Sequence, residues 1–264
     1  MKLKIGVFDS GIGGFTILTS LLKTRNDVEV FYLADTKRMP YGNKSFYQIR
    51  SIAKEICTWF EDKNLDALLI ACNTTNSCAL DILEENLKIP CFDLINSVSE
   101  MVNHGIIGIL ATPTTVRSSY YEKVMSFKKE NLKIFQQECP EFVYEIEKNK
   151  LNVKKINFLS DFYLSPLLKE NIQELILGCS HYPLIYNVLR NKVNSNIKII
   201  DPSAALVKKF NESFLVPENS HCKRVSYENV RFFVTAKNEE FSQKVKYWLE
   251  INKEIRLVNL RSND

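Results

Sequence analysis

Short apolar runs that alternate with amphipathic segments are the feature that most constrains the fold of this chain. The runs have the length and the content of β-branched and aromatic residues that are typical of strands. We expect strands at 3–8, 28–33, 66–70, 106–110, 132–135, 174–177, 197–200 and 230–234. The segments between them are expected to be helical. Strands that alternate with helices predict an α/β fold with mostly parallel sheets, covered by helices on both faces.

Two expected helix ends carry local signals. The helix expected over 45–62 opens with "SFYQ", in which Ser45 and Gln48 have the spacing of a capping box. Gly105 follows the segment "SEMVNH", and glycine commonly ends a helix. We therefore predict that Ser45 caps the start of one helix and that Gly105 caps the end of another.

Part of the pattern occurs twice. Residues 5–8 of "KIGVFDSGIGG" match residues 107–110 of "GIIGILATPTT" at an offset of 102 residues. "LLIACNTT" and "LILGCSHY" match at an offset of 107, the difference between Cys179 and Cys72. Loops readily absorb the five-residue difference, and the period is too long for a solenoid. The pattern predicts two similar α/β halves.

We therefore predict two pseudo-symmetric, doubly wound domains. The first comprises residues 1–97 together with 206–264, so that the C-terminal segment returns to it, and the second comprises 98–205. Ligands of open parallel sheets bind beyond the carboxyl ends of the strands. The active site is expected in the cleft between the domains.

Charge and cysteine usage bound the partners and the compartment. The net charge is only +4 over 264 residues, and opposite charges are interspersed, so neither nucleic acid nor a membrane is an expected partner. The N-terminal apolar run is broken by Asp9, unlike a signal peptide, and no run approaches the ~18 apolar residues of a spanning helix. Seven irregularly spaced cysteines favour a reducing cytoplasm over a disulfide framework.

Two of these cysteines differ from the others. Cys72 and Cys179 each end an apolar run and precede small polar residues and an expected helix. A thiol at a helix N-terminus has a lowered pKa and more thiolate at neutral pH. The remaining cysteines are expected to fill space in the core or loops. They are Cys57, Cys78, Cys91, Cys139 and Cys222.

Two similar thiols on opposite sides of one cleft would suit the inversion of a carbon stereocentre. One group removes the proton from one face of the carbon while the other delivers a proton to the opposite face. The roles exchange in the reverse direction, so each group must serve as both acid and base. Such a pair titrates as a coupled system.

The chain resembles the cofactor-independent glutamate racemases of the aspartate/glutamate racemase superfamily. The resemblance covers most of the chain and follows six motifs in order. They are "GVFDSGIGG" (6–14), "PYGNKS" (40–45), "ACNT" (71–74), "GIIGILAT" (105–112), "CPEFVYEIE" (139–147) and "LGCSHYPL" (177–184).

The resemblance implies a cytoplasmic enzyme, commonly a homodimer, that interconverts L- and D-glutamate for peptidoglycan precursors without pyridoxal phosphate or metal. It implies catalytic thiols at Cys72 and Cys179, a supporting acid at Asp9, and a supporting pair at Glu147 and His181. The implied substrate contacts are Asp9, Ser10, Tyr41, Gly42, Asn73, Thr74, Thr112, Thr115, Ser180 and His181.

The chain departs from the family pattern at three places. Thr75 stands where alanine is usual, and Ser180 replaces a threonine. The segment 141–145 is more polar than usual. Glu145 lies two residues from Glu147, so the sequence leaves open which of them supports the second thiol.

The motifs also have a physical interpretation. The glycine-rich turn after the first strand aims Asp9 and Ser10 into the cleft. Neutral donors at helix starts, such as Asn73, suit a substrate carboxylate, which gains negative charge when the α-carbon is deprotonated. Tyr41 with Gly42 is expected at the side-chain carboxylate. His181 can relay a proton with Cys179.

Three alternatives stay open at this point. A zinc site could use Cys72, Cys179, His181 and Asp9, although C-x-H lacks the usual ligand spacing. The protein could bind acidic amino acids without catalysis. Sequence physics alone does not separate glutamate from aspartate, because one methylene changes binding by only ~1–3 kcal/mol.

Overall fold

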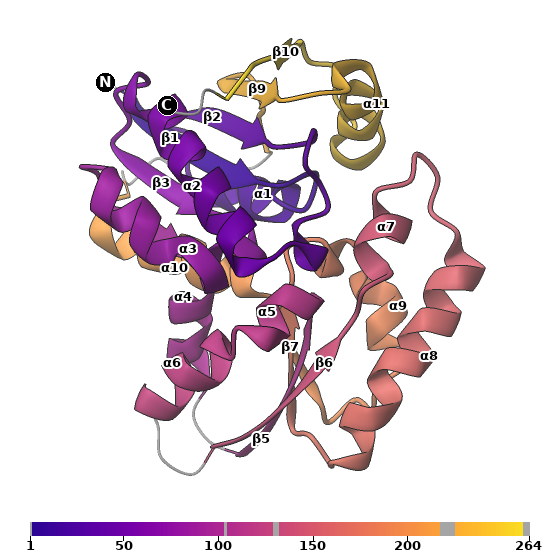
Figure 1. Cartoon of the computed structure of the whole chain (residues 1–264). Coiled ribbons are helices and arrows are strands. Elements are labelled where there is room, and N and C mark those ends of the chain that lie inside the picture. Colours follow the sequence, from indigo (N-terminus) through magenta and orange to yellow (C-terminus); the bar gives the residue numbers. More distant parts are fainter. Residues whose placement is uncertain (1, 103–104, 129–131, 217–224, 261–264) are drawn as a thin grey trace.

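Two parallel sheets form the centre of the computed structural model, which describes residues 2–102, 105–128, 132–216 and 225–260 (Figure 1). The larger sheet has the strand order β10-β9-β2-β1-β3-β4 and the smaller has the order β6-β5-β7-β8. Every described strand pair is parallel. The strands are β1 (Leu3–Asp9), β2 (Val28–Ala34), β3 (Ala67–Ile70), β4 (Cys91–Asp93), β5 (Gly105–Ala111), β6 (Leu132–Glu138), β7 (Glu174–Gly178), β8 (Lys198–Ile200), β9 (Val230–Val234) and β10 (Ile255–Leu257).

Helices connect the strands, as the alternating pattern predicted. They are α1 (Phe15–Thr24), α2 (Phe46–Glu61), α3 (Asn73–Asn86), α4 (Leu94–Met101), α5 (Pro113–Arg117), α6 (Tyr120–Lys128), α7 (Phe142–Ile146), α8 (Val153–Lys169), α9 (Tyr186–Arg190), α10 (Pro202–Ser213) and α11 (Asn238–Leu249), with short 3-10 turns η1 (Tyr41–Asn43) and η2 (Tyr182–Ile185). All eight predicted strands are present. The strands β4 and β10, of three residues each, were not predicted.

The two halves repeat the same sheet topology. In the larger sheet β1 lies between β2 and β3, and in the smaller sheet β5 lies between β6 and β7. Gly6 pairs with Phe31 and Leu68, and Gly108, 102 residues later, occupies the same place in β5. The predicted pseudo-symmetric α/β architecture is therefore confirmed.

Each sheet is covered on both faces by apolar side chains. In the larger sheet one face packs against α1, and the other packs against α2 and α3. In the smaller sheet one face packs against α8, and the other packs against α4 and α6. One apolar cluster runs without interruption from the α1 face of the larger sheet to the α8 face of the smaller sheet. This shared core fixes the two halves against each other.

The C-terminal segment adds to the larger sheet. β9 pairs with β2, and β10 pairs with β9. Phe241 of α11 contacts Phe15, Tyr32 and Phe232, so α11 lies over the same face of the sheet as α1. The domain boundaries expected at 97/98 and 205/206 stay a prediction.

The two helix-end predictions have different outcomes. Ser45 and Gln48 form the predicted capping box, with both reciprocal hydrogen bonds present. The prediction for Gly105 was wrong, because α4 ends at Met101 and Gly105 is the first residue of β5. Its positive φ of +109° explains the glycine, since L side chains rarely adopt that conformation.

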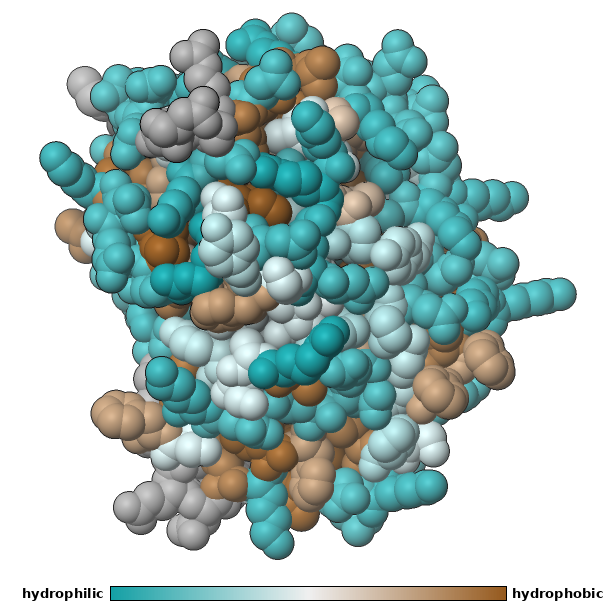
Figure 2. All heavy atoms as spheres, in the orientation of Figure 1, coloured by the Kyte–Doolittle hydropathy of each residue, from teal (hydrophilic) through white to brown (hydrophobic). Residues whose placement is uncertain are grey.

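The surface in Figure 2 is mostly polar, and the cysteines outside the candidate site that the structure describes are free thiols. Hydrophilic residues cover most of the face seen in Figure 2, with smaller hydrophobic areas between them. In the part of the chain that the structure describes, no helix is both long and apolar enough to cross a membrane. Cys57, Cys78, Cys91 and Cys139 are free thiols, and all but Cys91 are buried. Cys222 lies outside the described residues.

Candidate active site

The candidate residues lie at the carboxyl ends of the central strands of both sheets. Asp9 ends β1, and Cys72 is the N-cap residue of α3, just after β3. In the second half Thr112 is the N-cap residue of α5, after β5, and Cys179 directly follows β7. Because the strands are parallel, each sheet gathers these residues at one edge. Hydrogen bonds join the two edges directly.

The Asp9 carboxylate makes one of these bonds. Its Oδ2 accepts a hydrogen bond of 2.8 Å from the Ser180 hydroxyl, and its Oδ1 accepts one of 2.8 Å from the Gly11 N–H. Asp9 is fully buried, and burial raises its pKa although His181 and these two donors act in the opposite direction. A buried carboxyl with a raised pKa can take up a proton more readily than an ordinary aspartate.

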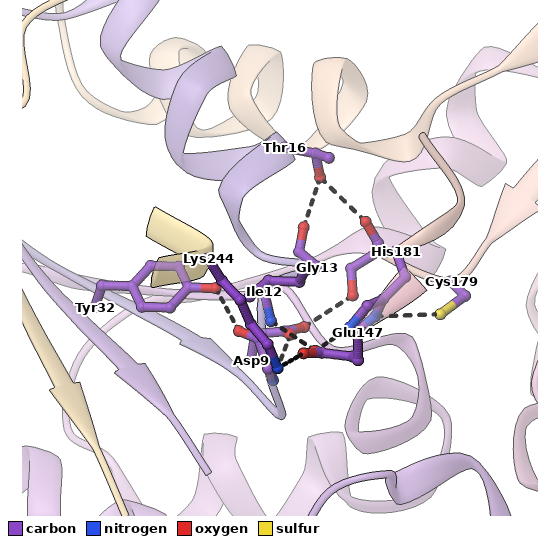
Figure 3. Close-up of polar contacts among 11 residues, drawn as sticks. Asp9, Ile12, Gly13, Thr16, Tyr32, Glu147, Cys179, His181 and Lys244 are labelled. Carbon is purple, nitrogen blue, oxygen red and sulfur yellow. Dashed lines mark hydrogen bonds and ion pairs between the residues drawn. The ribbon is translucent and has the colours of Figure 1, made fainter. Parts of the chain in front are cut away.

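A second buried chain of polar groups leads to Cys179 (Figure 3). The Cys179 sulfur lies 3.8 Å from His181 Nδ1, and His181 Nε2 lies 2.7 Å from Glu147 Oε1. The same Glu147 oxygen accepts a hydrogen bond of 2.9 Å from the Ile12 N–H. Glu147 Oε2 accepts a hydrogen bond of 2.9 Å from Lys244 Nζ. The thiol, imidazole, carboxylate and ammonium therefore form one continuous path.

The pKa values of this path follow from its contacts. Burial alone would raise the pKa of Glu147, but the hydrogen bond and charge of His181 and then those of Lys244 outweigh burial and lower it to about 2. Burial alone would lower the pKa of His181, but its contacts with Cys179 and Glu147 hold it well above its ordinary value. Glu147 is thus ionised at neutral pH, and His181 readily holds a second proton.

The structure separates the two candidate glutamates. Glu147 contacts His181, whereas both oxygens of Glu145 accept hydrogen bonds from Lys148, at 2.7 and 2.8 Å. Of the two, only Glu147 contacts the histidine beside Cys179.

Cys72 has a different environment from Cys179. Burial and then the negative charge of Asp9 raise its pKa to about 12, although the hydroxyl and N–H of Thr75 act to lower it. A negative charge on Cys179 would raise the pKa of Cys72 further. Both are nearly inaccessible, with 4% of Cys72 and 5% of Cys179 exposed. The helix N-terminus does not produce the lowered pKa that we expected for Cys72, because burial outweighs it.

Three threonine hydroxyls form a ring between the halves. The Thr112 hydroxyl lies 2.9 Å from those of Thr74 and Thr115, and the latter two lie 3.4 Å apart. Next to them, Asn73 Oδ1 accepts a hydrogen bond of 2.7 Å from Tyr121, while Asn73 Nδ2 is buried without a partner. An unpaired buried amide donor is costly unless something binds it.

Tyr41 and Gly42, predicted as substrate contacts, both make hydrogen bonds within the protein. The Tyr41 side chain is buried, and its hydroxyl donates a hydrogen bond to Asp35 Oδ2. Gly42 lies against Thr112, and its carbonyl accepts a hydrogen bond of 2.8 Å from the Thr114 hydroxyl. The Tyr41 hydroxyl is therefore committed to Asp35, which leaves the backbone of this turn as the part that faces Thr112.

Two residues that contact the candidate site, Lys244 and Tyr32, were not predicted from any sequence motif. Lys244 lies within an amphipathic helix that reads as a solvated surface element. Tyr32 lies within a buried strand, and its hydroxyl donates a hydrogen bond of 2.8 Å to the Gly11 carbonyl. Both contacts bridge distant parts of the chain, and no local pattern could have predicted them.

The geometry also bears on the zinc alternative. Among the described residues, no group of three or more His, Cys, Asp or Glu side chains is arranged to hold a metal ion. Asp9, Cys72, Cys179 and His181 all lie in this part of the chain. They therefore do not form the zinc site considered as an alternative.

A pocket of about 280 Å³ opens beside the polar path. Glu147 and Lys244 form part of its wall, together with side chains from three separate segments. The other lining residues are Thr36, Lys37, Met39, Pro40, Val143, Tyr144, Lys148, Lys237, Glu240 and Phe241. Solvent thus approaches the Glu147 end of the path, whereas the thiols lie deeper.

The chain is similar to known racemases in sequence. Residues 17–210 match the family model described as Asp/Glu/Hydantoin racemase. The chain is 44% identical over 260 residues to a glutamate racemase of Prochlorococcus marinus (strain NATL1A), with 98% of each chain covered.

Two solved structures have a similar fold. A glutamate racemase isoform from Bacillus anthracis matches with a TM-score of 0.89 and 27% identity, with 98% of each chain covered. A glutamate racemase from Francisella tularensis in complex with D-glutamate matches with a TM-score of 0.86 and 32% identity, with 99% of each chain covered.

Proposed function

Because the chain belongs to the Asp/Glu/hydantoin racemase family, we propose that it interconverts L- and D-glutamate by proton transfer between Cys72 and Cys179 at the α-carbon, without an added cofactor. The observation that carries the proposal is the placement of the two thiols. They follow equivalent strands of two repeated sheets, and the Asp9–Ser180 hydrogen bond joins the strand ends beside them.

Each half of the site supports its thiol in its own way. On the second side, His181 can accept the Cys179 proton at Nδ1 while Nε2 faces the Glu147 carboxylate, which stabilises the imidazolium. On the first side, we assign Asp9 to move a proton to or from Cys72, because its charge raises the pKa of that thiol. A thiolate on one side removes the α-hydrogen, and the thiol on the other side donates its proton to the opposite face.

Neutral donors support the charge that develops on the substrate. Deprotonation of the α-carbon moves negative charge onto the α-carboxylate, so donors aimed at that group stabilise the transition state. We assign this role to Asn73, whose Nδ2 is free, and to Thr74 and Ser180. The hydroxyls of Thr112 and Thr115 and the backbone near Tyr41 and Gly42 are assigned to the side-chain carboxylate.

The resemblance to glutamate racemases supports three further proposals. We propose that the protein acts in the cytoplasm, supplies D-glutamate for peptidoglycan precursors, and forms a homodimer. The last proposal is checked by the mass of the purified protein in solution. A monomer at all concentrations would contradict it.

Hydrogen exchange tests the reaction and its substrate together. Purified protein in deuterium oxide is expected to exchange the α-hydrogen of L- and D-glutamate without added cofactor, and to act less well on both aspartates. Binding of glutamate without exchange would instead indicate a non-catalytic binding protein.

Removal of each thiol tests the mechanism. Cys72→Ala and Cys179→Ala are each expected to lose racemisation, because neither remaining thiol can serve both faces of the carbon. Cys57→Ala is the matched control, since this thiol is buried and lies outside the site. Normal racemisation by either site variant would rule out the two-thiol mechanism.

A further inference from the structure

Lys244 is a buried lysine that takes no direct part in the proposed proton transfer. It lies on α11, in the C-terminal segment that adds to the larger sheet, and only 8% of the residue is exposed. Its Nζ lies 2.9 Å from Glu147 Oε2, which belongs to the segment after β6 of the smaller sheet. Lysine is rarely buried unless it is paired. Here the partner is the carboxylate next to His181.

The contacts of Glu147 are divided between its two oxygens. Oε1 faces His181 Nε2 and the Ile12 N–H, and Oε2 faces Lys244 (Figure 3). With both oxygens held, the carboxylate has one orientation toward the imidazole. A charged hydrogen bond of this kind adds both direction and energy.

We propose that Lys244 is a positioning residue for the Cys179 side of the site, which holds Glu147 against His181 and thereby sets the pH at which His181 takes up and releases its proton. The inference rests on the proposed racemase function for its kinetic readout alone. Lys244 acts through Glu147 and does not touch the reacting atoms.

The sign of the effect follows from the charges. Removal of a positive charge favours the protonated form of nearby acids, so Glu147 and His181 hold their protons to higher pH. The step in which His181 accepts a proton at Nδ1 moves to higher pH with them. Other charged or titratable groups near Glu147, His181 and Cys179 remain in place. On the buried side they are Asp9, Tyr32, Cys72, Tyr121, Cys139 and Tyr182, and on the pocket side they are Lys37, Lys148, Lys237 and Glu240.

The experiment replaces the charge while it keeps the helix. Lys244→Met removes the charge and the hydrogen bond, and Lys244→Gln removes the charge but keeps a donor. Lys246→Met is the matched control, because Lys246 lies two residues away on the exposed side of α11. One readout is the pH profile of kcat/KM for glutamate. The other is the rate at which iodoacetamide alkylates Cys179 as a function of pH, followed by peptide mass spectrometry.

We expect both profiles to move to higher pH by about one unit in Lys244→Met and Lys244→Gln, and to stay unchanged in Lys246→Met. Lower activity with unchanged profiles would overturn the proposal and leave Lys244 as an anchor of α11. If Lys244→Met fails to fold, Lys244→Gln decides between these outcomes. The alkylation profile needs no turnover. A wild-type protein without racemase activity would therefore contradict the proposed function and leave this inference testable.

Discussion

Asp9 and Glu147 are two buried carboxyl groups whose surroundings push their pKa values in opposite directions. Burial raises the pKa of Asp9, whereas His181 and Lys244 lower that of Glu147 to about 2. Pairs of this kind commonly mark groups with different acid and base roles. The two thiols are related by the repeat of the fold, but their chemical support is not symmetric. Cys72 has a carboxyl group nearby, and Cys179 has a histidine–carboxylate–lysine path.

The lowered pKa of Glu147 predicts a dependence of stability on pH. A carboxyl group with a lowered folded pKa stabilises the protein above its ordinary pKa of 4.5, and this stabilisation is lost as the pH falls toward 2. The shift corresponds to about 3 kcal/mol. We expect the free energy of unfolding to fall less steeply between these pH values in Glu147→Gln than in the wild type, as measured by urea unfolding.

Glu141→Gln is the control for this prediction. Glu141 lies on the same segment but its side chain is half exposed, in an ion pair with Lys155. It should therefore leave the pH dependence almost unchanged. If the free energy of unfolding fell equally steeply with pH in the wild type and in Glu147→Gln, the buried contacts of Glu147 would not lower its pKa.

The Ser180 hydroxyl predicts an effect on the Asp9 side. Ser180→Ala removes one of the two donors to Asp9, which leaves Asp9 Oδ2 without this partner. A hydrogen bond to a charged group is worth about 1.5–3 kcal/mol, so we expect kcat/KM for glutamate to fall by about tenfold or more. Ser180→Thr keeps the hydroxyl and should retain most of the activity. Equal activities of the alanine and threonine variants would contradict this role.

Short elements between the strands carry the site, and their ends are fixed by local side-chain contacts. The turn η1 is held from the second half, because the Thr114 hydroxyl donates to the carbonyls of Gly42 and Lys44, at 2.8 and 2.7 Å. α2 begins directly after this turn with the Ser45 capping box. The same few residues thus start a helix and place the backbone of the predicted substrate contact.

The capping box allows a test at the level of one helix. Ser45→Ala removes the side-chain acceptor for the Gln48 N–H and should lower the free energy of unfolding by about 1 kcal/mol. Ser51→Ala, at an exposed position inside α2, should be neutral or slightly stabilising because alanine has the higher helix propensity. Thermal or urea unfolding of both variants checks the difference. A cost as large in Ser51→Ala would argue against the cap.

The two halves of the molecule pack against each other, and both thiols are buried where they meet. The glycine-rich turn after β1 enters the second half so closely that a Cβ at Gly13 would lie 2.6 Å from His181 Nδ1. Ile12 and Asp9 of the same segment contact Glu147 and Ser180. With 4% and 5% of the two thiols exposed, this packing leaves little direct access to either sulfur.

This closure predicts the effect of a methyl group at the boundary. Gly13→Ala should hold the halves slightly apart, which lowers kcat/KM by about a hundredfold and speeds alkylation of Cys179, since a misplacement of about 1 Å can cost that much. Gly108→Ala is the control. Its Cβ would lie 2.7 Å from the Ile172 side chain, within the second half alone. It should lower stability without faster alkylation. The same alkylation rate in both variants would disprove the closure effect.

The sequence by itself determined eight of the ten described strands, the repeat, and the place of both thiols at strand ends. These features depend on local patterns: apolar periodicity sets strands and helices, and a short motif sets which residue ends a strand. It could not determine that Glu147 rather than Glu145 contacts His181, that the Tyr41 hydroxyl is committed to Asp35, or that Lys244 is buried against Glu147.

Tertiary structure decided these pairings because their partners lie far apart along the chain. Glu147 and Lys244 are separated by 97 residues, and Asp9 and Ser180 by 171. Only the packing of the two halves against each other brings them within hydrogen-bond distance. Burial there weakens solvent screening, so each contact shifts a pKa that the isolated residue would keep.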